Sequence, residues 1–294
     1  GVSLDRFFVC PVCAPTRAEF LTGRYHSRGG VRGVSLGEER LDLTERTIAE
    51  AFHAAGYATG AFGKWHNGSQ WPYHPRARGF DRYFGHTAGH WGEYFDAPLE
   101  DDGRMIRTSG YIVDVCTDRA DAFIRQHQRQ PFFCFIPFTT PHSPWSVPAA
   151  DWQRYHDREI RQRGVNPERE KPEETRCVLA VLEHQEQLVG AITERNTKPL
   201  GLIGASMGGA VAVELARRLP DSIQRLLLLA PAGLTGQPMP LPPLLDGLGV
   251  RFLALPGVRK GLCRSAFANP DRDVGPAELE IASLHLQTPG WADT

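Results

Sequence analysis

Strand and helix signals alternate along this chain, and the alternation restricts its fold more than any other feature. Tyr57–Phe62 is an apolar stretch typical of a strand. Phe132–Phe138 is a second apolar run bounded by prolines, which predicts a strand covered on both faces. Between them, residues 111–127 place apolar side chains at helical spacing. Because helices between strands favour layers packed on a largely parallel sheet, we predict an α/β fold.

The ends of one helix can be predicted from single residues. Thr47 and Glu50 have the spacing of a capping box, in which each side chain bonds the other's backbone N–H. Gly56 is typical of a helix end. Apolar residues on one face of the segment between them support the same helix: Ile48, Ala51, Phe52 and Ala55.

The second half of the chain repeats the alternation. A helix is predicted from about Glu173 to Arg195. Leu200–Ile203 then indicates a strand, Met207–Leu219 a helix and Ile223–Ala230 another strand. Residues 233–262, rich in Gly, Pro and Leu, indicate a mobile or cap-like connection, and residues 276–287 a further helix.

Composition excludes some partners. The formal net charge of −1 gives no electrostatic reason to expect nucleic acid or an anionic membrane. No apolar run reaches the length of a membrane span, and no signal sequence is visible. The compartment stays open, because the true N-terminus is not visible. The chain begins at Gly1 rather than Met, so we expect it to be processed or part of a longer protein.

The six cysteines are too sparse for a disulfide framework in a chain of 294 residues. Cys10-Pro-Val-Cys13 is a single C-x-x-C pair, which leaves a zinc site or a redox site as alternatives. A zinc site would need further ligands nearby. The sequence that follows the pair gives Cys13 another interpretation.

Residues 13–24 read Cys-Ala-Pro-Thr-Arg-Ala-Glu-Phe-Leu-Thr-Gly-Arg. This run resembles the signature of the type I sulfatases, in which the cysteine is converted into formylglycine. Gly63-Lys64-Trp65-His66 and Thr140-Pro141-His142-Ser143-Pro144 resemble the second and third motifs of that family, in family order. The resemblance covers about residues 1–180, including Gly79–Phe84, and implies an alkaline-phosphatase-like sheet.

The resemblance implies a role for each matching residue. Cys13, as hydrated formylglycine, would be the metal-bound nucleophile that attacks sulfur. Arg17 belongs to the stretch read by the modifying enzyme and would then steady the aldehyde hydrate. Lys64 would bind the sulfate, His66 would touch the nucleophile, and His142 would hold sulfate or protonate the leaving group.

The resemblance also implies calcium, yet most of its expected ligands are absent. The family takes an Asp-Asp pair ahead of the cysteine and an Asp-Asn pair well after the third motif. Asp5 is the only acidic residue before Cys13, and no Asp-Asn dipeptide occurs. Asp101-Asp102 lies in the wrong order along the chain and precedes Gly103, which predicts a surface turn.

Gly204-Ala-Ser-Met-Gly208 resembles the nucleophile elbow of a different family, the α/β-hydrolases, and the likeness extends over about residues 183–294. Ser206 would be the nucleophile, placed on a turn too tight for side chains at either glycine. The backbone N–H of Met207 would belong to the oxyanion hole. The one later histidine, His285, lies in an expected helix rather than a late catalytic loop.

We therefore expect two incomplete α/β units: a sulfatase-like fragment over residues 1–180 and a hydrolase-like fragment over 181–294, joined near residues 178–186. Unpaired strand edges would make such a composite sticky. The expected activity is hydrolysis of a small sulfated sugar or aryl sulfate through formylglycine, impaired by the missing metal ligands. A serine esterase using Ser206 and a non-catalytic composite remain as alternatives. The expected partner protein is a formylglycine-generating enzyme.

Overall fold

The computed structural model describes residues 10, 12–160, 171–195, 200–205 and 207–229. All of them belong to one compact unit, Gly1–Leu234. The helices and strands in chain order are α1 Cys13–Thr22, α2 Ile48–Ala54, β1 Ala58–Lys64, the 3-10 helix η1 Pro75–Ala77, β2 Arg82–His86, β3 Pro98–Asp101, β4 Arg104–Arg107, α3 Ile112–His127, β5 Phe132–Phe135, α4 Ala149–Gln153, α5 Pro172–Arg195, β6 Leu200–Ala205, α6 Met207–Arg218 and β7 Ile223–Leu229.

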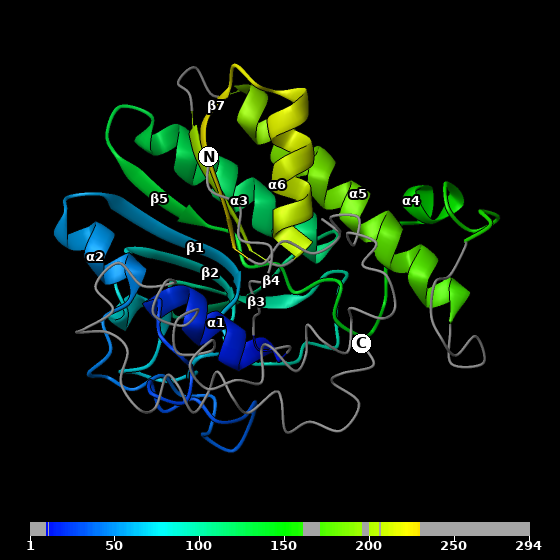
Figure 1. Cartoon of the computed structure of the whole chain (residues 1–294). Coiled ribbons are helices and arrows are strands. Elements are labelled where there is room, and N and C mark those ends of the chain that lie inside the picture. Colours follow the sequence, from blue (N-terminus) through cyan, green and yellow to red (C-terminus); the bar gives the residue numbers. More distant parts are fainter. Residues whose placement is uncertain (1–9, 11, 161–170, 196–199, 206, 230–294) are drawn as a thin grey trace, which may run out of the picture. The chain divides into compact units, whose positions relative to one another are not determined.

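Five of these strands form one sheet in the order β4-β3-β2-β1-β5 (Figure 1). β1 is parallel to both β2 and β5, whereas β3 and β4 form an antiparallel hairpin beside β2. Parallel strands end at the same edge of a sheet, so Lys64 and His86, which pair at the ends of β1 and β2, lie next to each other. This edge carries the candidate site.

Helices cover both faces of the five-stranded sheet (Figure 1). On one face, Leu21 of α1 and Ala49 of α2 pack with Ala61 and Tyr83 of the sheet. On the other face, a cluster of buried side chains includes Phe62 and Phe84 of the sheet and extends to Ile192 of α5. α3 contributes six of its members: Ile112, Val113, Cys116, Ala120, Phe123 and Ile124. The α/β fold that the sequence predicts is confirmed.

The second sheet is a parallel pair, β6 and β7, with α6 packed against it and against α5. Three apolar side chains of this pair, Ile203, Leu226 and Leu227, are exposed within the described residues. Because β6, α6 and β7 follow one another along the chain, the strand–helix–strand order expected for residues 200–230 is confirmed. The expected segments at 233–262 and 276–287 lie outside the described residues.

Local predictions hold in detail at α2. Thr47 accepts a hydrogen bond from Glu50 N at 3.1 Å, and Glu50 accepts one from Thr47 N at 2.7 Å, which completes the capping box. The prediction for Phe132–Phe138 was wrong in two respects. The strand ends at Phe135, and its residues are only half-buried, because β5 is an edge strand.

Candidate active site

The first part of the site is the N-terminal turn of α1. Cys13 is the first residue of this helix, and Arg17 lies one turn later on the same face. The Arg17 guanidinium donates to the carbonyl oxygen of Lys64 at 2.6 Å and to that of Phe138 at 3.3 Å. Arg17 therefore ties α1 to the end of β1 and to the loop that follows β5.

Lys64 and His66 lie at and just beyond the end of β1, and both are fully buried at 1% exposure. The close approach of two chains positions them. Lys64 N donates to the carbonyl oxygen of Pro137 at 2.8 Å, and a Cβ on Gly63 would lie 2.4 Å from that oxygen. Only glycine fits there, which explains the Gly-Lys spacing of the motif.

His142 lies in the loop between β5 and α4, and hydrogen bonds from several elements hold this loop. Tyr94 Oη donates to the carbonyl oxygen of His142 at 2.7 Å, and Tyr111 Oη donates to that of Ser146 at 2.9 Å. Thr139 Oγ1 lies 2.8 Å from His86 Nε2. The loop has no strand or helix to fix it, so these side chains define its path.

The sequence interpretation missed two histidines at this site. His86 is buried at the end of β2, beside Lys64 in the sheet register. The His90 ring packs edge-on against that of His142, with centroids 4.7 Å apart. The available signal for His86 was a histidine at the carboxyl end of the strand that contains Phe84 and Gly85, since side chains at the carboxyl ends of neighbouring parallel strands converge.

Burial shapes the charges of the site. Burial, with the nearby Arg17, lowers the pKa of Lys64 to about 8. Burial and the two cations Lys64 and Arg17 also lower the pKa of His66 to about 4 and that of His86 to about 3, against hydrogen bonds that favour the charged forms. At neutral pH the two imidazoles are neutral, whereas Lys64 and Arg17 carry the positive charge.

The hydrogen bonds of these imidazoles indicate their tautomers. His66 Nε2 lies 2.8 Å from the carbonyl oxygen of Val34, so Nε2 carries the proton. His66 Nδ1 is buried without a hydrogen-bond partner among the described residues. His86 Nδ1 donates to the carbonyl oxygen of Ala88 at 3.0 Å, which leaves Nε2 to accept from Thr139.

Within the described residues, neither Arg17 nor Lys64 forms an ion pair with a carboxylate. No group of three or more His, Cys, Asp and Glu side chains is placed to hold a metal ion in that part of the chain. The described residues therefore do not fit calcium, which prefers six to eight oxygen ligands. Asp5 lies outside the described residues.

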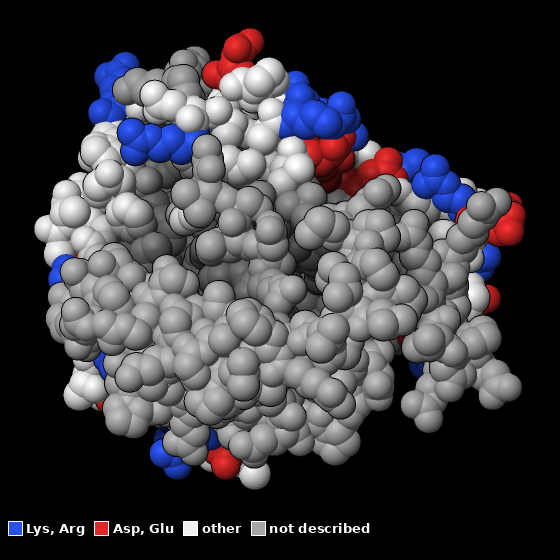
Figure 2. Space-filling view, viewed as in Figure 1, with Lys and Arg blue, Asp and Glu red and all other residues white. Residues whose placement is uncertain are grey.

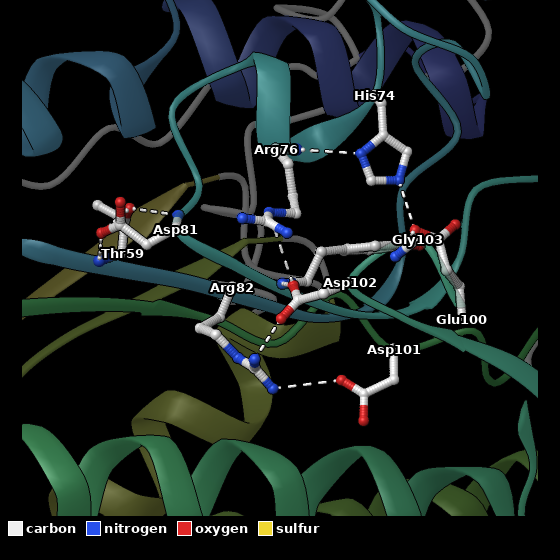
Figure 3. Close-up of polar contacts among 10 residues, drawn as sticks. Thr59, His74, Arg76, Asp81, Arg82, Glu100, Asp101, Asp102 and Gly103 are labelled. Atoms are coloured by element: carbon white, nitrogen blue, oxygen red, sulfur yellow. Dashed lines mark hydrogen bonds and ion pairs between the residues drawn. The ribbon is translucent and has the colours of Figure 1, made fainter. Parts of the chain in front are cut away.

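Asp101 and Asp102 end β3 and begin the turn to β4, as the sequence predicts. Both carboxylates point toward the guanidinium of Arg82, and Arg76 lies 3.8 Å from Asp102 (Figure 3). Gly103 follows with φ of +94°. These carboxylates are engaged in ion pairs with arginines at the hairpin. Asp102 lines a cavity of about 520 Å³ together with Trp71, His74, Arg76, Glu100, Gly103 and Met105.

The zinc and redox alternatives for Cys10 and Cys13 find no support among the described residues. Both are free, half-buried thiols. Among the described residues, no group of three or more His, Cys, Asp and Glu side chains is placed to hold zinc either.

The second candidate site lies where β6 passes into α6. β6 ends at Ala205 and α6 begins at Met207, while Ser206 itself lies outside the described residues. A Cβ on Gly204 would lie 2.5 Å from the carbonyl oxygen of Gly208 and 2.6 Å from Cβ of Ala212. The turn thus requires glycine at 204. The expectation that it also excludes a side chain at Gly208 was wrong, because a Cβ there would meet no atom within 4 Å. His285 lies outside the described residues.

Comparisons with known proteins match models of two families to this chain. The Sulfatase family model matches residues 1–195. A second family model, Serine aminopeptidase, S33, matches residues 179–267. The two matched regions overlap over residues 179–195, which belong to α5.

Individual relatives are sulfatases. Arylsulfatase G of Canis lupus familiaris is 50% identical over 91 residues, which are 30% of this chain and 17% of that protein. The uncharacterized sulfatase YdeN of Escherichia coli K12 is 31% identical over 169 residues, 48% of this chain and 30% of that protein. The chain therefore spans less than a third of the length of either.

A solved structure shares the fold. Ps i-CgsB in complex with k-i-k-neocarrahexaose superposes with a TM-score of 0.53 at 23% identity, over 65% of this chain and 46% of that one. This likeness confirms the α/β fold. Among the described segments, none of the helices combines the length and apolar character needed to cross a bilayer.

Proposed function

The chain belongs to the sulfatase family, and on this premise we propose that its cationic site binds the sulfate group of a small sulfated substrate and hydrolyses the ester. One observation carries the proposal. The buried ammonium of Lys64 lies beside Arg17, with no carboxylate paired to either among the described residues. A buried charge needs an opposite partner, and a sulfate oxygen supplies one.

The surrounding groups fit an anion as well. Cys13 lies in the first turn of α1, where the backbone N–H groups and the helix dipole favour negative charge. Arg17 is held by two carbonyl oxygens, so it orients the cysteine turn and the end of β1. His66 Nδ1, buried and without a partner among the described residues, can accept a hydrogen bond from a hydroxyl group at Cys13.

Formylglycine at Cys13 would supply an aldehyde hydrate as the nucleophile toward sulfur, and the half-buried position beside two cations fits such a group. The chain's own residues would then act as binding and proton-handling groups. Lys64 would hold the sulfate oxygens, and Arg17 would steady the turn that carries residue 13. His142, from the loop after β5, would hold the sulfate or protonate the leaving oxygen.

Calcium is the other group that the family implies, and the described residues do not fit it. No step of this proposal passes through a metal ion. Relatives support the substrate class: Ps i-CgsB is described with a neocarrahexaose, a sugar, and one curated relative is Arylsulfatase G. We propose a sugar sulfate or aryl sulfate for this chain.

The test uses two cysteines that lie close together in the sequence. The full chain is produced with a formylglycine-generating enzyme, the peptide holding Cys13 is weighed by mass spectrometry, and release from 4-methylumbelliferyl sulfate is followed. We expect a lowered mass for the Cys13 peptide and turnover that Cys13→Ala abolishes and Cys10→Ala retains. Equal turnover in both variants would sink the proposal.

A second function has one specific observation in its favour. Gly204 is required by the close contact between β6 and the first turn of α6, as a nucleophile elbow demands. The match of residues 179–267 to the S33 family supports the same idea. We propose esterase activity through Ser206 as the alternative, with the N–H of Met207 as an oxyanion donor.

A fluorophosphonate probe tests this alternative, since it reacts with activated serines. Labelling that Ser206→Ala removes and Ser222→Ala leaves would support an esterase. If neither labelling nor sulfate release occurs under conditions where the chain is folded, the non-catalytic interpretation holds.

A further inference from the structure

Helix α5 presents successive residues to different parts of the molecule. Glu183 lies 3.6 Å from Arg154 beyond α4. His184 lies between Asp114 of α3 at 2.6 Å and Asp151 of α4 at 3.0 Å. Gln185 contacts the loop that carries His142, and Glu186 pairs with Arg218 of α6 at 3.0 Å. One turn of α5 is thus fixed on several sides.

Gln185 makes the contact that reaches the candidate site. Its side chain is 4% exposed, and its amide nitrogen donates to the carbonyl oxygen of Thr140 at 3.3 Å and to Thr140 Oγ1 at 2.6 Å. Thr140 is itself buried and lies two residues before His142. Both bonds are enclosed, so their loss leaves polar atoms without partners.

Other elements also contact this loop. Thr139 Oγ1 donates to Nε2 of His86, which lies at the end of β2, and Tyr94 Oη donates to the carbonyl oxygen of His142. Gln185 is the contact from α5. With Thr139 held by the sheet and Thr140 held by the helix, the backbone entering His142 has little freedom to shift.

We infer that Gln185 is a positioning residue for His142, acting through Thr140; the inference rests on the proposed sulfatase function. Gln185 does not touch the reacting atoms. It holds the Thr140 backbone, and with it the path of the loop to His142, whose ring packs edge-on against His90. Because the clamp at His184 and the ion pair at Glu186 fix this turn of α5, the helix cannot follow the loop if the amide is lost.

The chain offers a matched control on the same helix. Gln187 is exposed, and its amide contacts only Glu183 among the described residues, at 3.4 Å. Gln185→Met keeps the length and removes the amide, whereas Gln187→Met makes the same chemical change away from the loop. Gln185→Asn keeps an amide but is one methylene too short to reach Thr140, which provides a second variant if Gln185→Met folds poorly.

Two measurements separate this inference from the proposed function. The first is kcat and KM with 4-methylumbelliferyl sulfate; we expect kcat/KM of Gln185→Met to fall about 10- to 100-fold, mostly in kcat, and Gln187→Met to match the wild type. The second is the carbon–proton NMR signal of the His142 ring, identified by its loss in His142→Asn. This NMR signal can be measured whether or not the protein turns over the substrate.

We expect the His142 signal to move in Gln185→Met and Gln185→Asn and to stay in place in Gln187→Met. If the wild type shows no turnover, the proposed function fails, and the ring signal alone decides the inference. A His142 signal that coincides with the wild type in both Gln185 variants overturns it. A loss of turnover with an unmoved signal overturns it too, because the effect would not pass through the loop.

Discussion

His66 owes its orientation to Gly89, a glycine that none of the recognisable motifs contains. A Cβ on Gly89 would lie 2.1 Å from His66 Nε2, the atom that donates to Val34. We expect Gly89→Ala to push the ring away and to weaken sulfate binding about tenfold or more, since overpacking costs about 1–3 kcal/mol. Isothermal titration with sulfate measures the loss.

Gly92 supplies the control for this substitution. It lies in the same segment, and a Cβ there would meet no atom within 4 Å. Gly92→Ala should bind sulfate like the wild type. Equal affinity of the Gly89→Ala and wild-type proteins would show that the ring is free to relocate without loss.

Lys64 gives the site a dependence on pH. Its pKa is lowered to about 8, first by burial and then by Arg17, so the ammonium form is present below that pH and is lost above it. Sulfate affinity should therefore fall as the pH rises from 7 to 9. Lys64→Met should bind sulfate weakly and without this pH dependence. An affinity that stays level between pH 7 and pH 9 would contradict the assignment of Lys64 as the sulfate-binding cation.

Short motifs made the residues of the site predictable, but only in part. Lys64 and His66 were predicted because the Gly-Lys-Trp-His spacing is local, and the structure places both at the end of β1. His86 and Gln185 were missed because their contacts, to Thr139 and Thr140, join segments 53 and 45 residues apart. No periodicity in the sequence reports such a pairing.

At the scale of elements, the clamp around His184 joins α3, α4 and α5. Burial lowers the pKa of this imidazole, but the hydrogen bond and charge of Asp114 and the charge of Asp151 outweigh burial and raise it. Its folded pKa thus lies above the unfolded value of about 6.5. The stability it contributes is complete below about pH 6.5 and is lost as the pH rises through the folded value.

We expect His184→Ala to lower the free energy of unfolding by about 2 kcal/mol at pH 6, since it leaves Asp151 buried beside fewer partners. The deficit should shrink as the pH rises. Urea unfolding at several pH values measures both effects. His156→Ala is the control, because His156 pairs with an exposed Asp157. A deficit that is constant from pH 6 to pH 9 would rule out the charged clamp.

Element boundaries followed from the sequence where local signals were strong. α5 was predicted from 173 to 195 and runs from Pro172 to Arg195. The hairpin of β3 and β4 was not predicted, because residues 98–107 lack apolar alternation and pair through backbone bonds. The ion pair between Arg82 of β2 and Asp101 joins this hairpin to β2 (Figure 3). That hairpin depends on its place beside β2, which no local signal reports.

At the scale of the whole chain, both matched families include residues 179–195 of α5. The predicted junction near residues 178–186 thus lies within a continuous helix whose faces contact α3 on one side and α6 on the other. Figure 2 shows Lys and Arg next to Asp and Glu on the described surface over α5 and α6. α5 is therefore the element through which the hydrolase-like part can support the sulfatase-like part.

The ion pair between Glu186 and Arg218 tests that support. Burial raises the pKa of Glu186, and Arg218 opposes the rise. Without Arg218, ionised Glu186 would remain buried against α6, so Arg218→Ala should lower the free energy of unfolding by about 1 kcal/mol at pH 7. The loss should grow as the pH rises through the pKa of Glu186 and vanish when the carboxyl is protonated.

Arg217 is the matched control, since it pairs with Glu214 on the solvent side of α6. Arg217→Ala should cost less than about 0.5 kcal/mol. Amide hydrogen exchange then locates the effect: in Arg218→Ala, protection should fall in α5 from about Glu183 to Gly190 as well as in α6. If protection falls in α6 alone, the two parts fold independently, and α5 is held by the sulfatase-like part without help from its neighbour.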